Sequence, residues 1–317
     1  VSISQRTCGK GLMAYLFIID PVDSLNTTKD STLLLMKECV RRKIDTYFCE
    51  INQFSMNEGN LNIYSHKVLG FKEKINYKNS ELHESAFFNK IFIRKDPPFD
   101  DDYLNLTYLL DHAVKKDIEV INNPSSVRNH NEKLSILNFE EIIPPTIVTS
   151  TSKDVINFLR IHKKIVLKPI NGMGGNGIFV TDNSDQNLNS ILETVTVKDS
   201  KVMMAQKYVS DITKGDKRII IIKGKPLPFC LARIPGDLDF RANLAKGGVG
   251  VAKKLTEQDI KIVNSIKQYL VKNKLGFVGI DVIGKYLTEI NVTSPTCLVE
   301  IEKQTGFNCA EYVIDAL

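Results

Sequence analysis

Between Met13 and about Ile121 the sequence alternates short apolar runs with amphipathic stretches, and this alternation constrains the fold more than any other feature. The apolar runs have the length of buried strands, and the longer stretches place apolar residues at helical spacing. The expected strands are 14–19, 46–50, 90–93 and 118–121, and the expected helices are 31–43 and 103–116. Strands that alternate with helices form a parallel sheet with crossover helices. We therefore predict an α/β first domain.

The chain leaves this pattern after Asn122-Asn123-Pro124. Pro124 suits the first turn of a helix, which we expect to run to about Leu137. Past Pro144-Pro145 the expected elements are a helix over 153–160, strands over 165–168 and 178–181, a helix over 188–193 and a strand over 202–206. This order indicates an α+β unit.

The last third is expected to contain two hairpins, 217–233 and 277–292, separated by the glycine-rich, polar segment 234–250. A loop of that length inside a compact domain is either functional or disordered. Between this loop and the second hairpin, 256–274 has the pattern of a helix whose capping box runs from Thr256 to Asp259. Its predicted apolar stripe consists of Ile260, Val263, Ile266 and Leu270.

Charge and composition exclude several classes of protein. The 42 Lys and Arg alternate with 37 Asp and Glu along the whole length of 317 residues, so no basic stripe for nucleic acid is present. The six cysteines form no C-x-x-C pair and the five histidines stand singly, which argues against a disulfide framework and a structural zinc cage. No apolar run is long enough to span a bilayer. We expect residues 1–12 to be a loose, disordered extension or an upstream start artefact.

A glycine-rich loop lies between two expected strands. Gly172, Gly174 and Gly177 give a formal G-x-G-x-x-G spacing, but that dinucleotide fingerprint needs a helix after the loop, and here a strand follows. Strand, glycine loop and strand indicate a flap whose backbone amides can close over phosphates; the alternative is an ordinary hairpin turn. Lys168 at the end of the preceding strand is either a phosphate counter-charge or a solvated lysine.

The hairpin 277–292 carries the strongest local signal for a metal. Glu289 and Asn291 lie two apart on one strand and so share a face. Asp281 joins them only if the loop has an odd length or an equivalent bulge is present, and we predict one of these. Three oxygen ligands suit Mg²⁺, which takes its remaining ligands from water and phosphates. The alternative for Glu289 alone is a solvated acidic residue at a sheet edge.

Three arginines, Arg218, Arg233 and Arg241, bracket or lie within the segment 234–250. Guanidinium groups bind carboxylate and phosphate with two parallel hydrogen bonds, so together they indicate an anionic substrate. Any one of them alone would be read as a surface arginine.

Several strings together resemble one known family. They are DP (20–21), TKDS (28–31), RKDPPFD (94–100), NEKL (131–134), LKP (167–169), GMGG (172–175), GDKR (215–218), CLARIP (230–235) and TEINVTSPT (288–296). The chain resembles the prokaryotic-type glutathione synthetases of the ATP-grasp superfamily from about Met13 almost to its last residue. RKDPPFD and EINVTSPT are specific to this branch, whereas the flap and the E-x-N pair also occur in other ATP-grasp ligases.

The resemblance implies an ATP-grasp fold, α/β with α+β character in the C-terminal part. It divides the chain into a Rossmann-like, parallel-sheet pre-ATP-grasp domain (13–130), a lid domain (131–209) with a flap at 171–177, and a C-terminal domain (210–317) whose mobile loop is 234–250. It further implies that γ-glutamylcysteine and glycine are joined at the expense of ATP through an acyl phosphate. Mg²⁺, or alternatively Mn²⁺, cytoplasmic location and a homotetramer follow from the same resemblance.

The resemblance also implies roles for individual residues. The ATP contacts would be Lys133, Lys168, Gly172, Gly174, Gly175, Gln206, Lys207, Tyr208, Val209 and Asp216. Position 207 departs from the family pattern, because Lys207 stands where Asn or Glu is expected. The metal ligands would be Asp281, Glu289 and Asn291, and the catalytic arginines Arg218, Arg233 and Arg241. Substrate contacts would come from Asp20, Lys29, Asp30, Ser31, Arg233, Arg241, Ser294 and Thr296.

Other interpretations remain open at this point. Another ATP-grasp ligase, acting on D-alanine or on a glutamate-containing peptide, shares the flap and the acidic residues. A non-catalytic ATP-binding module shares the fold, since fold alone does not imply turnover. A nicotinamide-dependent oxidoreductase is suggested only by the glycine spacing and is disfavoured by the strand that follows it.

Overall fold

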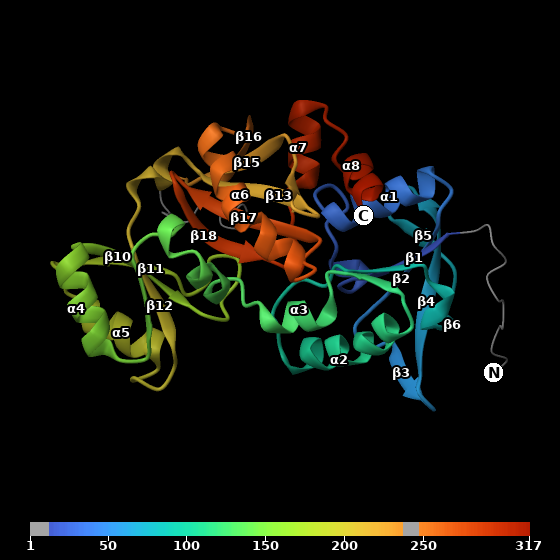
Figure 1. Cartoon of the computed structure of the whole chain (residues 1–317), viewed down its shortest axis with the longest axis horizontal. Helices are drawn as coiled ribbons and strands as arrows, with labels where there is room; N and C mark the ends of the chain where they lie inside the picture. Colours follow the sequence, from blue (N-terminus) through green and yellow to red (C-terminus); the bar gives the residue numbers. More distant parts are fainter. Residues whose placement is uncertain (1–12, 237–246) are drawn as a thin grey trace.

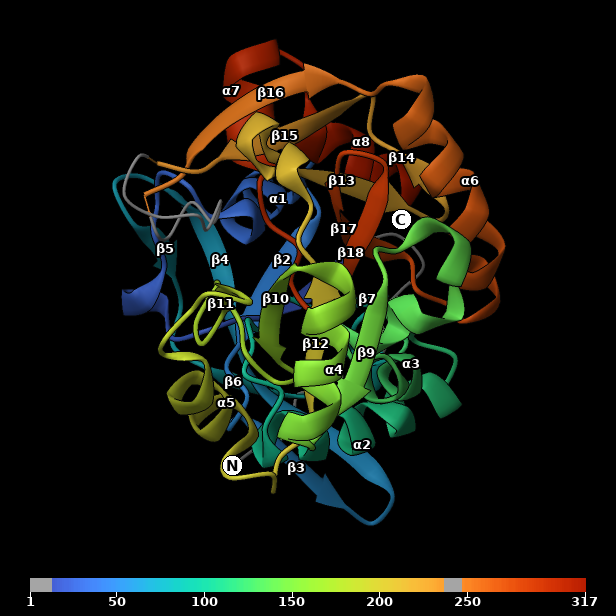
Figure 2. The same ribbon diagram turned by 90° about the vertical axis from the view of Figure 1, so that its left-hand side faces the viewer.

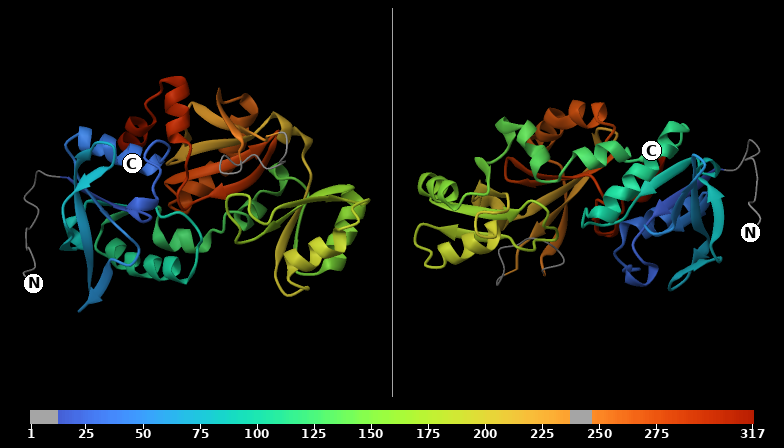
Figure 3. Two further views of the ribbon diagram at one scale, coloured as in Figure 1. Left: turned by 180° about the vertical axis from the view of Figure 1, so that it is seen from behind. Right: turned by 90° about the horizontal axis from the view of Figure 1, so that it is seen from below.

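Three sheets, each with its own covering helices, make up the protein (Figure 1). The computed structural model describes residues 13–236 and 247–317; the predicted extension 1–12 and most of the predicted loop 234–250 lie outside the described residues. The N-terminal sheet lies at one end of the molecule, the lid sheet at the other and the C-terminal sheet between them, as the views from behind and below also show (Figure 3). Along the chain the lid comes second, but in space the C-terminal sheet lies between the lid and the N-terminal sheet.

The N-terminal sheet has a parallel centre, as the strand and helix alternation predicts. Its parallel strands are β1 (Ala14–Ile18), β2 (Asp45–Cys49), β7 (Lys90–Ile93) and β8 (Glu119–Ile121), in the order β2-β1-β7-β8. Its helices are α1 (Ser31–Arg41), α2 (Asp101–Lys115) and α3 (Pro124–Asn129). Phe17 and Phe92 on one face pack with α1, and Leu16 and Ile91 on the other face pack with α2. The sheet is therefore covered on both faces.

An antiparallel extension of this sheet has no counterpart in the sequence-based prediction. Its strands are β3 (Phe54–Asn57), β4 (Asn60–Phe71), β5 (Ile75–Tyr77) and β6 (Glu81–Glu84). The long strand β4 pairs with β2, β3, β5 and β6. Its exposed face carries polar and charged residues, so the stretch lacks the continuous apolar run by which the parallel strands were recognised.

The helix predicted from Pro124 to about Leu137 is wrong in its end point. Helix α3 stops at Asn129, His130 is extended, and a separate 3₁₀ helix covers Leu134–Asn138. The side chain of Asn131 accepts hydrogen bonds from the backbone amides of Lys133 (3.0 Å) and Leu134 (3.1 Å). This local competition for backbone donors starts a new turn and ends the first helix. The remaining 3₁₀ helices are Val22–Ser24, Ser85–Phe87, Glu140–Ile142 and Ser210–Lys214.

The lid is a four-stranded antiparallel sheet with two helices on one face (Figure 2). In spatial order its strands are β11 (Phe179–Asp182), β10 (Lys164–Pro169), β12 (Met203–Lys207) and β9 (Thr146–Thr149), and its helices are α4 (Ser152–His162) and α5 (Leu188–Thr196). Both helices pack on the odd-numbered residues of β10 and β12, such as Leu167 and Ala205. The even-numbered residues Val166, Lys168 and Gln206 therefore occupy the opposite face.

The C-terminal sheet is antiparallel and contains both predicted hairpins. Its strands run in the order β16 (Val249–Lys254), β15 (Phe229–Ile234), β13 (Asp216–Ile222), β17 (Phe277–Ile283) and β18 (Tyr286–Asn291), with the short β14 (Lys225–Pro226) beside β13. Helix α6 (Glu257–Lys272) begins with the predicted capping box of Thr256 and Asp259. Its predicted stripe is correct except at Ile260, which is 39% exposed, whereas Ile262 is buried in its place.

The hairpin β17–β18 has the register that the metal prediction requires. Its turn, Gly284-Lys285, has an even length, so a regular ladder would set Asp281 opposite Thr288. An irregularity between Asp281 and Val282 shifts the pairing, and Asp281 lies opposite Glu289. The equivalent bulge is thus confirmed, and the odd-length loop is not used.

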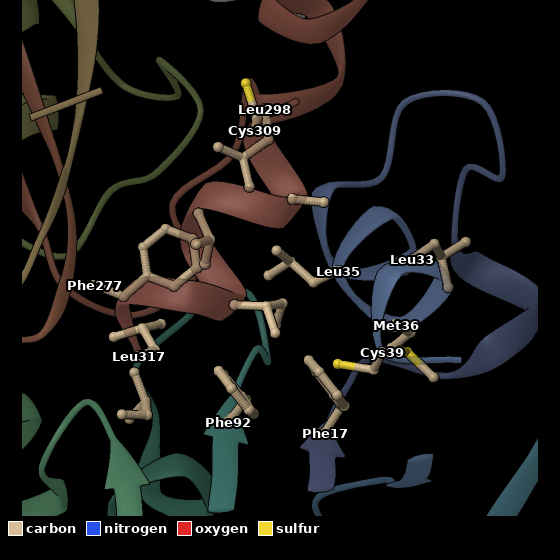
Figure 4. Close-up of a cluster of buried hydrophobic side chains, with 14 of the residues drawn as sticks. Phe17, Leu33, Leu35, Met36, Cys39, Phe92, Phe277, Leu298, Cys309 and Leu317 are labelled. Carbon is tan, nitrogen blue, oxygen red and sulfur yellow. The ribbon is translucent and has the colours of Figure 1, made fainter. Parts of the chain in front are cut away.

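One hydrophobic cluster joins the first and last domains (Figure 4). Phe17 and Phe92 of the N-terminal sheet stack at a centroid distance of 4.6 Å. Around them lie side chains of α1 together with Phe277 of β17 and residues of the last two helices, α7 (Leu298–Thr305) and α8 (Cys309–Ala316). Within 13–236 and 247–317 no helix combines the length and apolar character needed to cross a bilayer.

A single buried amide connects the parallel sheet to the hairpin β17–β18. Asn122, directly after β8, donates from Nδ2 to the carbonyls of Phe277 (2.8 Å) and Val292 (2.6 Å). Its Oδ1 accepts from the backbone amide of Phe277 (2.6 Å). One end of each strand of the hairpin is therefore held by the same side chain, which is 2% exposed.

We predict that Asn122→Ala lowers the free energy of unfolding by about 3 kcal/mol, because each lost hydrogen bond contributes about 1 kcal/mol net and buried partners are left unpaired. Urea unfolding followed by circular dichroism measures the change. Asn187→Ala is the matched control, since Asn187 is exposed and its side chain makes no capping hydrogen bond. Equal stabilities for the two variants would contradict the role given to Asn122.

Candidate active site

A cavity of about 390 Å³ lies where the lid, the C-terminal sheet and the N-terminal domain meet. Asp96 reaches it from the N-terminal domain, Lys168 from the lid and Asp281 from the C-terminal sheet. Most of the residues predicted from the sequence line it: Lys133, Lys168, Gly172, Gly174, Gly175, Gln206, Lys207, Tyr208, Val209, Asp216, Arg218, Arg233, Asp281, Glu289, Asn291, Ser294 and Thr296. Residues far apart in the sequence are thus brought to one cavity.

Five predicted residues are not among those that line the cavity. Asp30 caps α1 by accepting from the amide of Leu33 (2.8 Å), Ser31 accepts from the amide of Leu298 (3.2 Å), and Lys29 is exposed beside them. Asp20 pairs with Lys95 (2.7 Å) and accepts from the amide of Asp96 (2.8 Å), so it supports a residue of the wall. Arg241 lies outside the described residues. Substrate contacts for these five stay predictions.

The polar wall of the cavity is one face of the C-terminal sheet. Asp216 and Arg218 alternate on β13, and the register places Arg233 opposite Asp216 and Asp281 opposite Arg218. The intervening residues, such as Ile219, point to the other face and pack with α6. Strand alternation thus gives the sheet a charged face toward the cavity and a mainly apolar face toward α6. The charged residues of this wall all lie on strands.

Asp281 is the centre of a buried ion network. Arg218 donates to it from Nε (2.5 Å) and from a terminal nitrogen (3.0 Å), and Arg233 donates to it at 2.9 Å. Arg233 also bonds Asp216 at 2.5 Å. Burial alone would raise the pKa of Asp281, but the two guanidiniums outweigh burial and hold that pKa well below its usual range. Asp281 is therefore a carboxylate at neutral pH.

The donor set fits a hard divalent cation. Among the described residues Glu289 forms one ion pair, with Lys168 at 3.8 Å, and its carboxylate makes no side-chain hydrogen bond. Asn291 donates from Nδ2 to the carbonyl of Gly279 (3.2 Å), which leaves its amide oxygen free for a ligand. Asp281 keeps unused lone pairs beside the two arginines. Carboxylate and amide oxygens are the ligands that Mg²⁺ prefers, and two anionic donors with one amide leave room for water and phosphate.

Two buried lysines face this acidic group. Lys133 is 2% exposed and donates to Glu132 and to the carbonyl of Gly172, each at 2.5 Å. Burial would lower the pKa of Lys133, but Glu289 and Glu132 outweigh it and raise the pKa. Lys133 is therefore an ammonium group on the wall of the cavity, tied directly to the glycine loop, and Lys168 lies 3.8 Å from Glu289.

The glycine loop between β10 and β11 has backbone conformations that require glycine. Gly174, Gly175 and Gly177 have φ values of 60°, 78° and 69°, in the left-handed region. A Cβ on Gly177 would also come within 2.9 Å of the Pro169 ring. A strand follows the loop, as predicted, so β11 stands where a dinucleotide fingerprint needs a helix. A role of the loop as a flap over phosphates stays a prediction.

The far end of the cavity has the character of a base-binding slot. Val166 and Val180 of the lid and Ile283 of β17 line it with aliphatic side chains. Gln206 is fixed by a hydrogen bond from Nε2 to Thr146 (3.0 Å), and the amides of Lys207 and Tyr208 bond to the carbonyls of Pro145 (2.9 Å) and Lys164 (3.0 Å). These hydrogen bonds hold the end of β12 in place. A planar ring would lie beside it, between the aliphatic side chains.

Four residues of the wall carry chemistry that the sequence analysis did not assign: Asp96, Glu132, Cys297 and Glu300. Asp96 and Glu132 lie inside quoted strings, RKDPPFD and NEKL, so their strings contained a signal that was not used. Cys297 and Glu300 follow TEINVTSPT directly, where the end of a strand meets the start of α7. No spacing rule in a single sequence identifies that pair.

Comparison with known proteins agrees with the geometry. Residues 13–128 match the family described as "Prokaryotic glutathione synthetase, N-terminal domain", and residues 132–306 match "Prokaryotic glutathione synthetase, ATP-grasp domain". A glutathione synthetase of Nitrosomonas europaea is 41% identical over 96% of this chain and 97% of its own. One from Neisseria meningitidis serogroup B is 42% identical over 96% of this chain and 98% of its own.

Solved structures share the fold at low sequence identity. A D-cycloserine synthetase has a TM-score of 0.66 at 12% identity and covers 95% of this chain and 99% of its own. A RiPP-associated ATP-grasp ligase of Chryseobacterium gregarium has a TM-score of 0.63 at 16% identity, with 96% and 98% covered. Both matches confirm the predicted ATP-grasp fold. Together with the two domain matches over nearly the whole chain, they show that this chain belongs to the prokaryotic glutathione synthetase family of ATP-grasp ligases.

Proposed function

We propose that the protein joins γ-glutamylcysteine to glycine and converts ATP to ADP and phosphate. The observation that carries the proposal is the convergence of Lys133 and Lys168 on the acidic hairpin in one cavity, in a chain of this family. Such a cavity suits a nucleoside triphosphate at one end and a carboxylate at the other. Lysine and arginine side chains of the wall supply positive charge for both.

The chemistry explains why so many cations are needed. A carboxylate is a poor acyl donor because its oxygen does not leave, so the γ-phosphoryl group is first moved onto the cysteinyl carboxylate. The glycine amine then attacks the acyl carbon, and phosphate leaves with its bonding electrons. Bringing one anion to another is opposed by several kcal/mol in a site shielded from water. Catalysis therefore rests on positioning and positive charge.

The residues of the wall divide this work by position. Lys133 and Lys168 would hold phosphate oxygens, and the stretch 206–209 would hold adenine between the aliphatic walls. Arg218 and Arg233 would contact the carboxylate as it becomes an acyl phosphate. Both guanidiniums are held in place by Asp281 and Asp216, so little side-chain entropy remains to be lost when an anion binds.

Asp281, Glu289 and Asn291 would hold Mg²⁺, which neutralises and orients the phosphate oxygens; Mn²⁺ suits the same donors. Glu289 is half-buried and lacks a close cationic partner among the described residues, so its oxygens are available to the ion. Ser294 and Thr296, on the strand that leaves the hairpin, would lie beside the acceptor. The hydroxyl of Ser294 donates to the carbonyl of Arg94 (3.2 Å), which ties this strand to the N-terminal domain.

Two properties of the family extend the proposal beyond the site: a homotetrameric assembly and a cytoplasmic location. Their support is the family membership of the chain. Sedimentation equilibrium of the purified protein tests the assembly, with a mass of four chains expected.

Identification of the product tests the reaction directly. ATP, Mg²⁺, γ-glutamylcysteine and glycine should give glutathione, identified by mass spectrometry, and ADP release should need both amino components. ADP release only with D-alanine or with a glutamate-containing peptide would assign the chain to another ATP-grasp activity. Nucleotide binding without any turnover would leave a binding module.

We predict that Gly174→Ala raises the KM for ATP about tenfold, because a left-handed residue other than glycine costs about 1–2 kcal/mol and the flap loses its closed conformation. Gly59→Ala is the matched control. Gly59 also has a positive φ (79°), and a Cβ added to either glycine would meet no atom within 4 Å, but Gly59 lies in the turn between β3 and β4. We expect both variants to lose a similar amount of stability, and we expect only Gly174→Ala to have a raised KM for ATP. An unchanged KM for ATP in Gly174→Ala would contradict a role of the glycine loop in ATP binding.

We predict that Glu289→Gln raises the Mg²⁺ concentration needed for half-maximal ADP release by about tenfold or more, since an anionic oxygen ligand is replaced by a neutral one. The melting temperature should fall as well, because Glu289 lies 3.8 Å from Lys168 and also attracts the ammonium group of the buried Lys133. Glu193→Gln, at an exposed position of α5, controls for the loss of one negative charge. The same Mg²⁺ requirement in both variants would argue against Glu289 as a ligand.

A further inference from the structure

Glu300 is a carboxylate on the cavity wall that the mechanism above does not use. It lies in the first turn of α7, and its Oε2 atom is buried without a hydrogen-bond partner among the described residues. A carboxylate oxygen removed from water without a partner costs free energy, so such a group calls for an explanation.

Local helix chemistry does not supply the explanation. Glu300 is the third residue of α7, the position from which a glutamate normally accepts a hydrogen bond from the N-cap amide. In α6 the corresponding residue, Asp259, does accept from the amide of its N-cap Thr256 (2.9 Å). In α7 the N-cap Cys297 has φ 86°, and no capping hydrogen bond to Glu300 forms. The carboxylate faces the cavity instead of closing its own helix.

Apart from Asp96, the other carboxylates on the described wall each have a cationic neighbour, although Oδ1 of Asp216 is also buried without a hydrogen-bond partner. Asp281 and Asp216 bond arginines, Glu132 bonds Lys133, and Glu289 lies 3.8 Å from Lys168. Asp96 forms no ion pair among the described residues, and its burial raises the pKa of its carboxyl group. Glu300 forms no ion pair among the described residues, so the missing partner is a cation that this part of the chain does not provide.

We propose that Glu300 binds the ammonium group of the acceptor amino acid, which is glycine in the proposed reaction. This inference rests on the proposed function. Of the three substrates, ATP carries no ammonium group, whereas glycine and the γ-glutamyl residue each carry one. A carboxylate with one buried, unpartnered oxygen recognises an ammonium through charge-assisted hydrogen bonds.

The position of Glu300 favours the ammonium of glycine. Glu300 lines the same cavity as Arg218 and Arg233, the two arginines proposed for the acyl phosphate. The amine that attacks must reach that same carbon. The ammonium of the γ-glutamyl residue is at the opposite end of the dipeptide from the carboxylate that is activated, because the peptide bond runs through the γ-carbon.

The test compares Glu300→Gln with Glu193→Gln in steady-state kinetics. We expect the KM for glycine to rise about tenfold or more, because a charge-assisted hydrogen bond is replaced by a weaker neutral one. The KM values for ATP and for γ-glutamylcysteine should be unchanged in both variants. A raised KM for γ-glutamylcysteine with an unchanged KM for glycine would overturn the proposal and assign Glu300 to the dipeptide ammonium.

A second nucleophile separates recognition of an ammonium from general damage. Hydroxylamine is uncharged at neutral pH and traps an acyl phosphate as a hydroxamate. Glu300→Gln should form hydroxamate from ATP and γ-glutamylcysteine at the parent rate, while its glycine-dependent rate falls. An equal loss with both nucleophiles would show a structural role and overturn the proposal. A parent protein that forms neither hydroxamate nor glutathione would instead refute the proposed function itself.

Discussion

The site depends on one buried carboxylate held between two guanidiniums. Asp281, Arg218 and Arg233 come from three neighbouring strands, and each is nearly inaccessible to water. Removing one partner from such a network leaves an uncompensated charge in the interior, which costs far more than a surface ion pair contributes. The arrangement fixes both arginines before any ligand arrives and keeps Asp281 ionised. Positive charge is thus presented to the cavity in a fixed geometry, as a reaction between two anions requires.

The three domains contribute to the site in different ways because their packing differs. The C-terminal sheet shares a hydrophobic cluster with the N-terminal domain, and Asn122 reinforces that contact. The lid packs mainly on its own helices, through a separate cluster. The C-terminal sheet and the N-terminal domain therefore form a common base, whereas the lid is a smaller unit that presents Lys168 and the glycine loop from above.

Local patterns made much of the fold predictable. Strand and helix alternation identified the parallel strands, and a strand, not a helix, was correctly expected after the glycine loop. The prediction failed where a single side chain ends a helix or where pairing with neighbouring strands stabilises a strand. Asn131 ends α3 early, and β4 is stabilised by pairing on both edges although its exposed face is polar. At the site, Glu289 and Asn291 followed from a period of two, but the contact between Arg218 and Asp281 requires β17 to lie beside β13 in the order β15-β13-β17. Nothing in a single sequence specifies that order.

The bulge in the hairpin β17–β18 has a consequence for how this protein can vary. Because the irregularity lies between Asp281 and the turn, the alignment of Asp281 with Glu289 is set by the sum of turn length and bulge. A relative with one more residue in its turn and no bulge would keep the same two carboxylates side by side. A relative with only one of these changes would rotate them to opposite faces of the sheet. Insertions and deletions near Gly284 are therefore tolerated in compensating pairs.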